Sequence, residues 1–152
     1  MANRTFDQEC SVARTLELVG ERWTLLIIRE AFLGVRRFDA FQSRLGIARN
    51  LLATRLTRLV DNGILERRRY QERPPRDEYR LTQKGEDLFP ALAALMAWGD
   101  RYTTGPEGPP TLLTHRGCGE VTIPGTVCSA CNAPITARDV IARPRAADAL
   151  PA

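Results

Sequence analysis

Residues 38–63 read FDAFQSRLGIARNLLATRLTRLVDNG, a stretch with the pattern of two helices joined by a tight turn. Its first part places apolar residues at helical spacing until Gly46 supplies the turn. A longer helix is expected from 48 to 62, because leucines recur every three or four residues and Asn62-Gly63 then gives a stop signal. Two helices around a glycine turn are typical of a helix-turn-helix that binds DNA.

Helices are also expected before this stretch, over 11–19 and from about 23 to 33. After it, two short strands that begin at Ile64 and Glu78 would form a hairpin, the wing. The segment between the strands, 68–77, would be a long basic tip. These elements predict a mainly α fold with a small β-hairpin, the winged helix-turn-helix.

One further helix is expected from about 84 to 102, with Thr82 as its N-cap. Pro90 would either start the regular part of this helix or kink it. Apolar residues from Leu88 to Tyr102 form a stripe wider than a monomer of this size needs. That width predicts a surface that another copy of the chain covers.

Arginine is concentrated in the centre of the chain. The sequence has 152 residues and a net charge of +4, and residues 36–80 hold 12 arginines against 6 acidic residues. The guanidinium group forks onto phosphates and guanine edges. An isolated charge run is usually a solvated face. This run coincides with the helix-turn-helix, which favours a DNA-binding surface.

The face of the 48–62 helix opposite its leucines predicts the contacts with DNA. Residues in the N-terminal half of a helix in the major groove reach the base edges first. Arg49 is therefore expected to bind guanine and Asn50 adenine, whereas Thr54 would bond a phosphate or touch a thymine methyl group. Arg55 and Arg58, further along, would hold phosphates. The wing would lie over the neighbouring minor groove or backbone through Arg68, Arg69, Arg73 and Arg76.

A Pro/Gly-rich linker at 105–110 separates the domain at 1–104 from a small β-rich, cysteine-containing module at 111–143. The last residues, 144–152, are expected to be disordered. The module reads HRGCG at 115–119 and CSACN at 128–132, so each half has two potential ligands three positions apart. Two such turns facing each other would form a zinc site from His115, Cys118, Cys128 and Cys131. The alternatives are that these cysteines pack the module or pair as a disulfide when oxidised.

The first two-thirds of the chain, about residues 10–103, resembles the HxlR-type winged-helix regulators. The motifs that carry the resemblance are Cys10-Ser-Val, Gly20 to Arg29, Arg37-Phe38, Ile47 to Leu59, Asp61 to Arg67 and Tyr79 to Gly85. The resemblance implies a transcription regulator that binds a palindromic site on double-stranded DNA as a homodimer joined through its first and last helices. We expect a repressor. Minimal members end near the last helix, so the resemblance does not assign a role to the module at 111–143.

The resemblance also suggests a signal to which the regulator responds. In redox-sensing members of the family, a cysteine at the position of Cys10 reacts with electrophiles or oxidants and shifts DNA affinity. Cys10 is accordingly a candidate redox sensor, and a plain buried cysteine at the dimer interface is the alternative. The signal would be redox, an electrophile or a small molecule, and the effector is not identified.

Other classes of protein have less support in the sequence. The chain has one histidine, and no nucleophile motif or phosphate-binding glycine loop is present, so we do not expect an enzyme. A winged-helix adaptor that binds proteins is the main alternative, and a small metal-dependent enzyme is a weaker one. Adaptors usually lack a basic reading face. No apolar run reaches the length of a membrane span, and the N-terminus lacks the layout of a secretory signal, which predicts a cytoplasmic protein.

Overall fold

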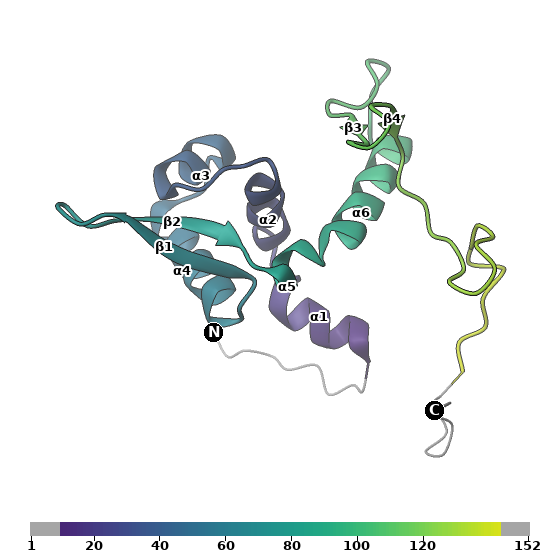
Figure 1. Cartoon of the computed structure of the whole chain (residues 1–152), viewed down its shortest axis with the longest axis horizontal. Coiled ribbons are helices and arrows are strands. Elements are labelled where there is room, and N and C mark those ends of the chain that lie inside the picture. Colours follow the sequence, from purple (N-terminus) through teal and green to yellow (C-terminus); the bar gives the residue numbers. More distant parts are fainter. Residues whose placement is uncertain (1–9, 144–152) are drawn as a thin grey trace. The chain divides into compact units, whose positions relative to one another are not determined.

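The first four helices follow the apolar spacing of the sequence. In the computed structural model, which describes residues 10–143, these helices are α1 (Ser11–Val19), α2 (Thr24–Phe32), α3 (Phe38–Leu45) and α4 (Arg49–Asp61) (Figure 1). The long helix predicted from 48 to 62 is confirmed, with Ala48 as its N-cap and Asn62 as its C-cap. Gly63 alone provides the left-handed stop, because its φ is 66° whereas that of Asn62 is −86°.

The wing is an antiparallel hairpin of β1 (Leu65–Gln71) and β2 (Arg76–Leu81). Its strands are longer than predicted, since pairing continues beyond Arg69 and Asp77. The expected long tip over 68–77 is therefore wrong, and only 72–75 connect the strands. Three arginines assigned to that tip lie on the strands instead: Arg68, Arg69 and Arg76.

The single helix expected from 84 to 102 is interrupted. It consists of α5 (Gln83–Glu86) and α6 (Phe89–Tyr102), separated by a turn. The N-cap at Thr82 is confirmed, because its hydroxyl oxygen accepts a hydrogen bond from the Gly85 N–H at 3.2 Å. Pro90 lies in the first turn of α6, where a backbone N–H has no intrahelical acceptor. Pro90 therefore starts the helix and does not kink it.

The described part of the chain divides into two compact units, with the division between Ala93 and Ala94. The apolar core belongs to the first unit and lies between α2, α3, α4 and the base of the hairpin. Each large side chain buried there contributes about 1.5–3 kcal/mol to folding. The core residues are Val19, Ile27, Ile28, Val35, Phe41, Ile47, Leu52, Leu56, Leu59, Ile64 and Leu65.

One carboxylate is buried beside this core. Glu30 of α2 is 2% exposed, and its carboxylate accepts hydrogen bonds from Arg29, at 2.5 Å, and from Arg44 of α3. Burial by itself raises the pKa of Glu30, but the hydrogen bonds from Arg44 and Arg29 outweigh it and hold the pKa below its ordinary value. This ion pair fastens α2 to α3, the first helix of the helix-turn-helix.

The second unit contains the end of α6 and a small β structure. Strand β3 (Leu113–Thr114) pairs antiparallel with β4 (Val121–Thr122), which gives the β-containing extension expected from the sequence. The division between the units falls inside α6, whereas the sequence placed a boundary at the linker 105–110. None of the helices described is both long and apolar enough to cross a membrane.

Candidate DNA-binding interface

The turn between α3 and α4 fixes the orientation of α4, the helix expected to contact the bases and called the reading helix below. Gly46 ends α3 with a φ of 63°, and its N–H donates to the Gln42 carbonyl oxygen at 2.9 Å. Ile47 follows and is buried in the core. One face of α4 is anchored there as well, through Leu52, Leu56 and Leu59. The opposite face of α4 is therefore directed away from the core.

Three predicted contact residues, Arg49, Asn50 and Thr54, are exposed on α4. The side chain of Arg49 is 69% exposed, and its guanidinium carbon lies 4.8 Å from the centre of the Phe38 ring. An Asp39 carboxylate oxygen is 3.5 Å away from the same guanidinium group. The Thr54 hydroxyl donates to the Asn50 carbonyl oxygen at 2.9 Å, so a phosphate contact would require that bond to break. Contact with a thymine methyl group requires no such change.

The other two arginines of α4 are engaged within the domain. Arg55 has a side chain that is only 16% exposed, and its Nη2 lies 2.8 Å from an oxygen of Glu21. Its Nε is buried and has no hydrogen-bond partner among residues 10–143. Arg58 donates to the backbone carbonyl of Glu17 in α1. The structure thus directs both side chains toward α1 and the residues that follow it, and their predicted phosphate contacts stay a prediction.

The arginines of the wing differ in how their charge is balanced. Arg68 lies 2.6 Å from a carboxylate oxygen of Glu66, and Arg69 lies 3.1 Å from one of Asp77. Arg73 and Arg76 are exposed and have no ion-pair partner within the described part of the chain. The hairpin extends away from the helices of its unit (Figure 1). Its outer end accordingly carries uncompensated positive charge.

Two basic residues before α3 were not assigned a role from the sequence. The Arg36 carbonyl accepts a hydrogen bond from the Tyr79 N–H of β2 at 2.7 Å. The Arg37 guanidinium carbon lies 4.9 Å from the centre of the Tyr70 ring of β1. This segment therefore fastens the wing to the start of α3. Their position at the start of the basic stretch was the feature of the sequence that could have indicated a role.

Cys10 is exposed and precedes α1 as its N-cap. Hydrogen bonds from the backbone N–H groups of Ala13 and Val12 lower the pKa of its thiol, and the charge of Arg14 adds a smaller effect in the same direction. A helix N-terminus favours a thiolate because its free N–H groups point toward the sulfur. The site therefore has the exposure and the polarity of a reactive cysteine.

The predicted zinc ligands occur as two pairs. His115 Nδ1 lies 3.3 Å from Cys118 Sγ. Hydrogen bonds from the backbone N–H groups of Ala130 and Cys131, followed by one from the Cys131 side chain, lower the pKa of Cys128. All three cysteines are free thiols. Within residues 10–143 no set of three or more His, Cys, Asp or Glu side chains lies close enough to hold a metal ion.

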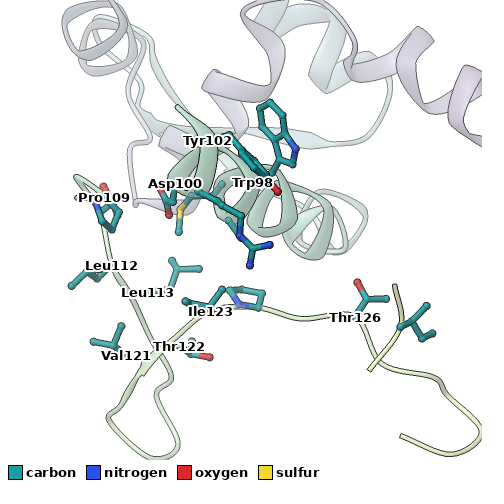
Figure 2. Close-up of a pocket in the computed structure, with 16 residues that line it drawn as sticks. Trp98, Asp100, Tyr102, Pro109, Leu112, Leu113, Val121, Thr122, Ile123 and Thr126 are labelled. Atoms are coloured by element: carbon teal, nitrogen blue, oxygen red, sulfur yellow. The ribbon is translucent and has the colours of Figure 1, made fainter. Parts of the chain in front are cut away.

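The second unit also contains an apolar cavity of about 930 Å³. Figure 2 shows Trp98 and Tyr102 of α6 on one side and Leu113 and Ile123 on the other. The rings of Trp98 and Tyr102 have centres 5.3 Å apart. The cavity is therefore bounded by the last turns of α6 and by the β3–β4 hairpin.

Comparison with known proteins agrees with this geometry. The model of the HxlR-like helix-turn-helix family matches residues 18–106. An uncharacterized HTH-type transcriptional regulator of Mycobacterium tuberculosis is 54% identical over 134 residues, which cover 88% of this chain and 85% of that protein. A second HTH-type transcriptional regulator, from Synechocystis, is 34% identical over 71% of this chain and 81% of its own length.

Solved structures show the same fold. The crystal structure of PA1607, described as a transcription factor, covers 90% of this chain and 96% of its own, with a TM-score of 0.81 and 38% identity. The redox regulator HypR in its oxidized form covers 63% of this chain and 100% of its own, with a TM-score of 0.58 and 30% identity.

Proposed function

Because this chain belongs to the HxlR-like helix-turn-helix family and is a DNA-binding transcriptional regulator, we propose that it binds a palindromic operator as a homodimer and acts as a repressor. The observation that carries the proposal is the exposed face of α4, where Arg49 and Asn50 present the side chains best suited to guanine and adenine edges. The proposal includes no catalytic activity. It places the protein with the DNA in the cytoplasm.

In this proposal, some residues of the interface contact the bases and others contact the phosphates. Arg49 and Asn50 read base edges, and Thr54 lies beside them. Arg73 and Arg76 bind the DNA backbone, because no neighbouring carboxylate in the described residues neutralises them. Arg55 is bonded to Glu21 and Arg58 to the Glu17 carbonyl, so a phosphate contact by either would require these bonds to break. Arg68 and Arg69 contribute less than the free arginines, since each is already paired.

Exposed apolar residues support the homodimer. On α1 they include Val12 and Leu16, and on α6 they include Leu95, Trp98 and Tyr102. A monomer would leave these side chains in water, whereas a second copy would cover them. Two-fold symmetry then gives two reading helices, which suit half-sites about one helical turn apart.

The test begins with selection of bound sequences from genomic DNA and continues with variants on the selected site. Arg49→Ala or Asn50→Ala is expected to cost about 1–3 kcal/mol, roughly 5- to 150-fold, on that site and to relax its sequence preference. Arg73→Ala and Arg76→Ala are the matched variants. Each is expected to weaken binding to specific and non-specific DNA alike. Each should also reduce by about 1 the slope of log affinity against log salt concentration.

Two outcomes would contradict the proposal. If Arg49→Ala weakened every sequence equally, α4 would not be the element that reads bases. If no genomic fragment were enriched, a protein-binding adaptor would become the better-supported function. Repression itself is tested with a reporter gene placed behind the selected site, where an increase of expression on binding would contradict a repressor.

A second function, a response to oxidants or electrophiles, is favoured by the exposed position and lowered pKa of Cys10. The similarity to the redox regulator HypR adds to this observation. We expect a thiol oxidant to change operator affinity in the native chain and not in Cys10→Ser. An equal change in both proteins would exclude Cys10 as the sensor.

A further inference from the structure

The second unit holds two turns with one and the same hydrogen-bond plan. In the first, the His115 N–H donates to the Glu120 carbonyl at 2.9 Å, and the Gly119 N–H donates back to the His115 carbonyl at 2.8 Å. The turn is closed by strands β3 and β4.

In the second turn, the Cys128 N–H donates to the Ala133 carbonyl at 2.8 Å, and the Asn132 N–H donates back to the Cys128 carbonyl at 2.8 Å. The spacing is identical, so Cys128 corresponds to His115 and Cys131 to Cys118. The two turns are thus equivalent supports for two pairs of side chains.

Both turns use a left-handed residue directly after the second member of the pair. Gly119 has a φ of 77° and Asn132 a φ of 60°. Among residues 10–143, Asn132 is the one non-glycine residue with a positive φ. Such a conformation is uncommon outside glycine, and side-chain-bearing residues hold it where the turn requires it. In both turns it brings the chain around the pair.

The spacing inside the first pair fits a shared metal ion. With a Zn–N bond of about 2.0–2.1 Å, a Zn–S bond of about 2.3 Å and tetrahedral angles, a nitrogen and a sulfur on one zinc lie roughly 3.5 Å apart. His115 Nδ1 and Cys118 Sγ lie 3.3 Å apart. The pair therefore needs almost no movement to become two ligands of one ion.

The stems of the two turns line the same cavity. Leu113 and Thr122 of the first stem contribute to its wall, and so do Thr126 and Ile135 of the second, which are joined by a 2.9 Å hydrogen bond. Figure 2 shows Leu113, Thr122 and Thr126 around it. Both pairs are therefore attached to walls of one hollow, and a short segment containing Gly125 connects them.

The module has no apolar core that could hold it together. No residue from 111 to 143 is buried, and Ile123 and Val121 are largely exposed. So small a segment usually depends on a metal or disulfides for its stability. A metal that joined the two pairs would supply the missing cross-link.

We propose that His115, Cys118, Cys128 and Cys131 bind one zinc ion within a single chain, and that the ion fixes the two turns as walls of the cavity beside Trp98. Three thiols release their protons to solvent on binding, and a neutral imidazole provides the fourth ligand. The zinc ion closes the module by drawing the two pairs together.

The first test measures metal in the full-length chain, purified under reducing conditions. We expect about one zinc per chain. After chelation, addition of Co²⁺ should give the visible absorption of a tetrahedral thiolate complex, and Zn²⁺ should displace it. Reduced protein that holds no zinc and gives no such absorption with Co²⁺ would overturn the proposal. One zinc per two chains would overturn the single-chain site.

Variants separate the four ligands from the remaining cysteine. His115→Gln and Cys128→Ser should each weaken Zn²⁺ binding by at least ~10- to 100-fold. That is the loss that follows removal of a group hydrogen-bonded to a metal ligand. Cys10→Ser is the matched control and should bind zinc as the native chain does. Equal loss in Cys10→Ser, or full affinity in Cys128→Ser, would refute the ligand set.

Fluorescence tests whether the zinc ion fixes the two turns as walls of the cavity. The chain has two tryptophans, and Trp23→Phe leaves Trp98 as the sole emitter beside the cavity. Removal of zinc should change its emission and expose 111–143 to protease, and added Zn²⁺ should reverse both changes. Unchanged emission and unchanged cleavage on removal would show that the ion does not hold the cavity wall.

Discussion

Replacement of the buried carboxylate, Glu30→Gln, tests the link between α2 and α3. Glu30 is 2% exposed and accepts charge-assisted hydrogen bonds from Arg29 and Arg44. A hydrogen bond to a charged group contributes about 1.5–3 kcal/mol. Glutamine keeps one acceptor oxygen, and both arginines are half exposed, with side chains 46% and 54% accessible, so solvent screens part of the loss. We expect a net cost of about 2 kcal/mol, which lowers Tm by roughly 8–16 °C in a domain of this size.

The stability that Glu30 contributes to the fold depends on pH. The folded-state pKa of Glu30 is lower than its ordinary value of 4.5. The ionised carboxylate therefore stabilises the fold above that pH, and the stabilisation is lost as the pH falls through the lower folded value. In urea titrations, the native chain and Glu30→Gln should differ most near neutral pH and converge in acid.

The control is Asp39→Asn, which removes an ion pair of exposed groups. Asp39 and Arg49 lie 3.5 Å apart, with side chains 89% and 69% exposed. Such pairs contribute about 0–1 kcal/mol. Equal loss in the two variants, or a difference from the native chain that did not shrink in acid, would refute the role given to Glu30.

Two other substitutions test separate parts of the structure. Leu95→Asp places a charge on the apolar surface of α6 and should shift light-scattering mass from dimer to monomer. Leu33→Asp, where the leucine is likewise 54% exposed but lies outside α1 and α6, should leave a dimer, and equal dissociation would contradict this interface. Gly85→Ala would place a Cβ 2.3 Å from the Ile64 carbonyl oxygen and should cost about 1–3 kcal/mol in chemical denaturation. Gly99→Ala, where the nearest atom is 3.6 Å away, should instead be neutral or stabilising, and similar losses at both glycines would contradict the clash.

Local signals explain what the sequence predicted correctly. The α3 bounds, Phe38–Leu45, agree with the prediction because apolar spacing and Gly46 define a helix and its end within a few residues. The Thr82 cap was equally readable, since its acceptor and donor lie three residues apart. The exposed face of α4 follows from the same helical period.

Long-range pairing explains what the sequence could not predict. Arg55 lies on the polar side of a helical projection, yet its partner Glu21 is 34 positions away and no local pattern indicates it. The hairpin tip was overestimated because Arg69 and Asp77 look like loop residues until the opposite strand pairs them. The zinc candidates were visible as a spacing, but the shared plan of their turns depends on backbone hydrogen bonds.

The bonds of Arg55 and Arg58 have a mechanical consequence. They connect the reading helix to Glu21, which follows α1, and to the Glu17 carbonyl of α1. A displacement of α1 must either break these bonds or carry α4 with it. In the proposed homodimer, a displacement of α1 that carried α4 with it would change the gap between the two reading helices. In that dimer, a chemical change at Cys10, directly before α1, would reach α4 through these bonds.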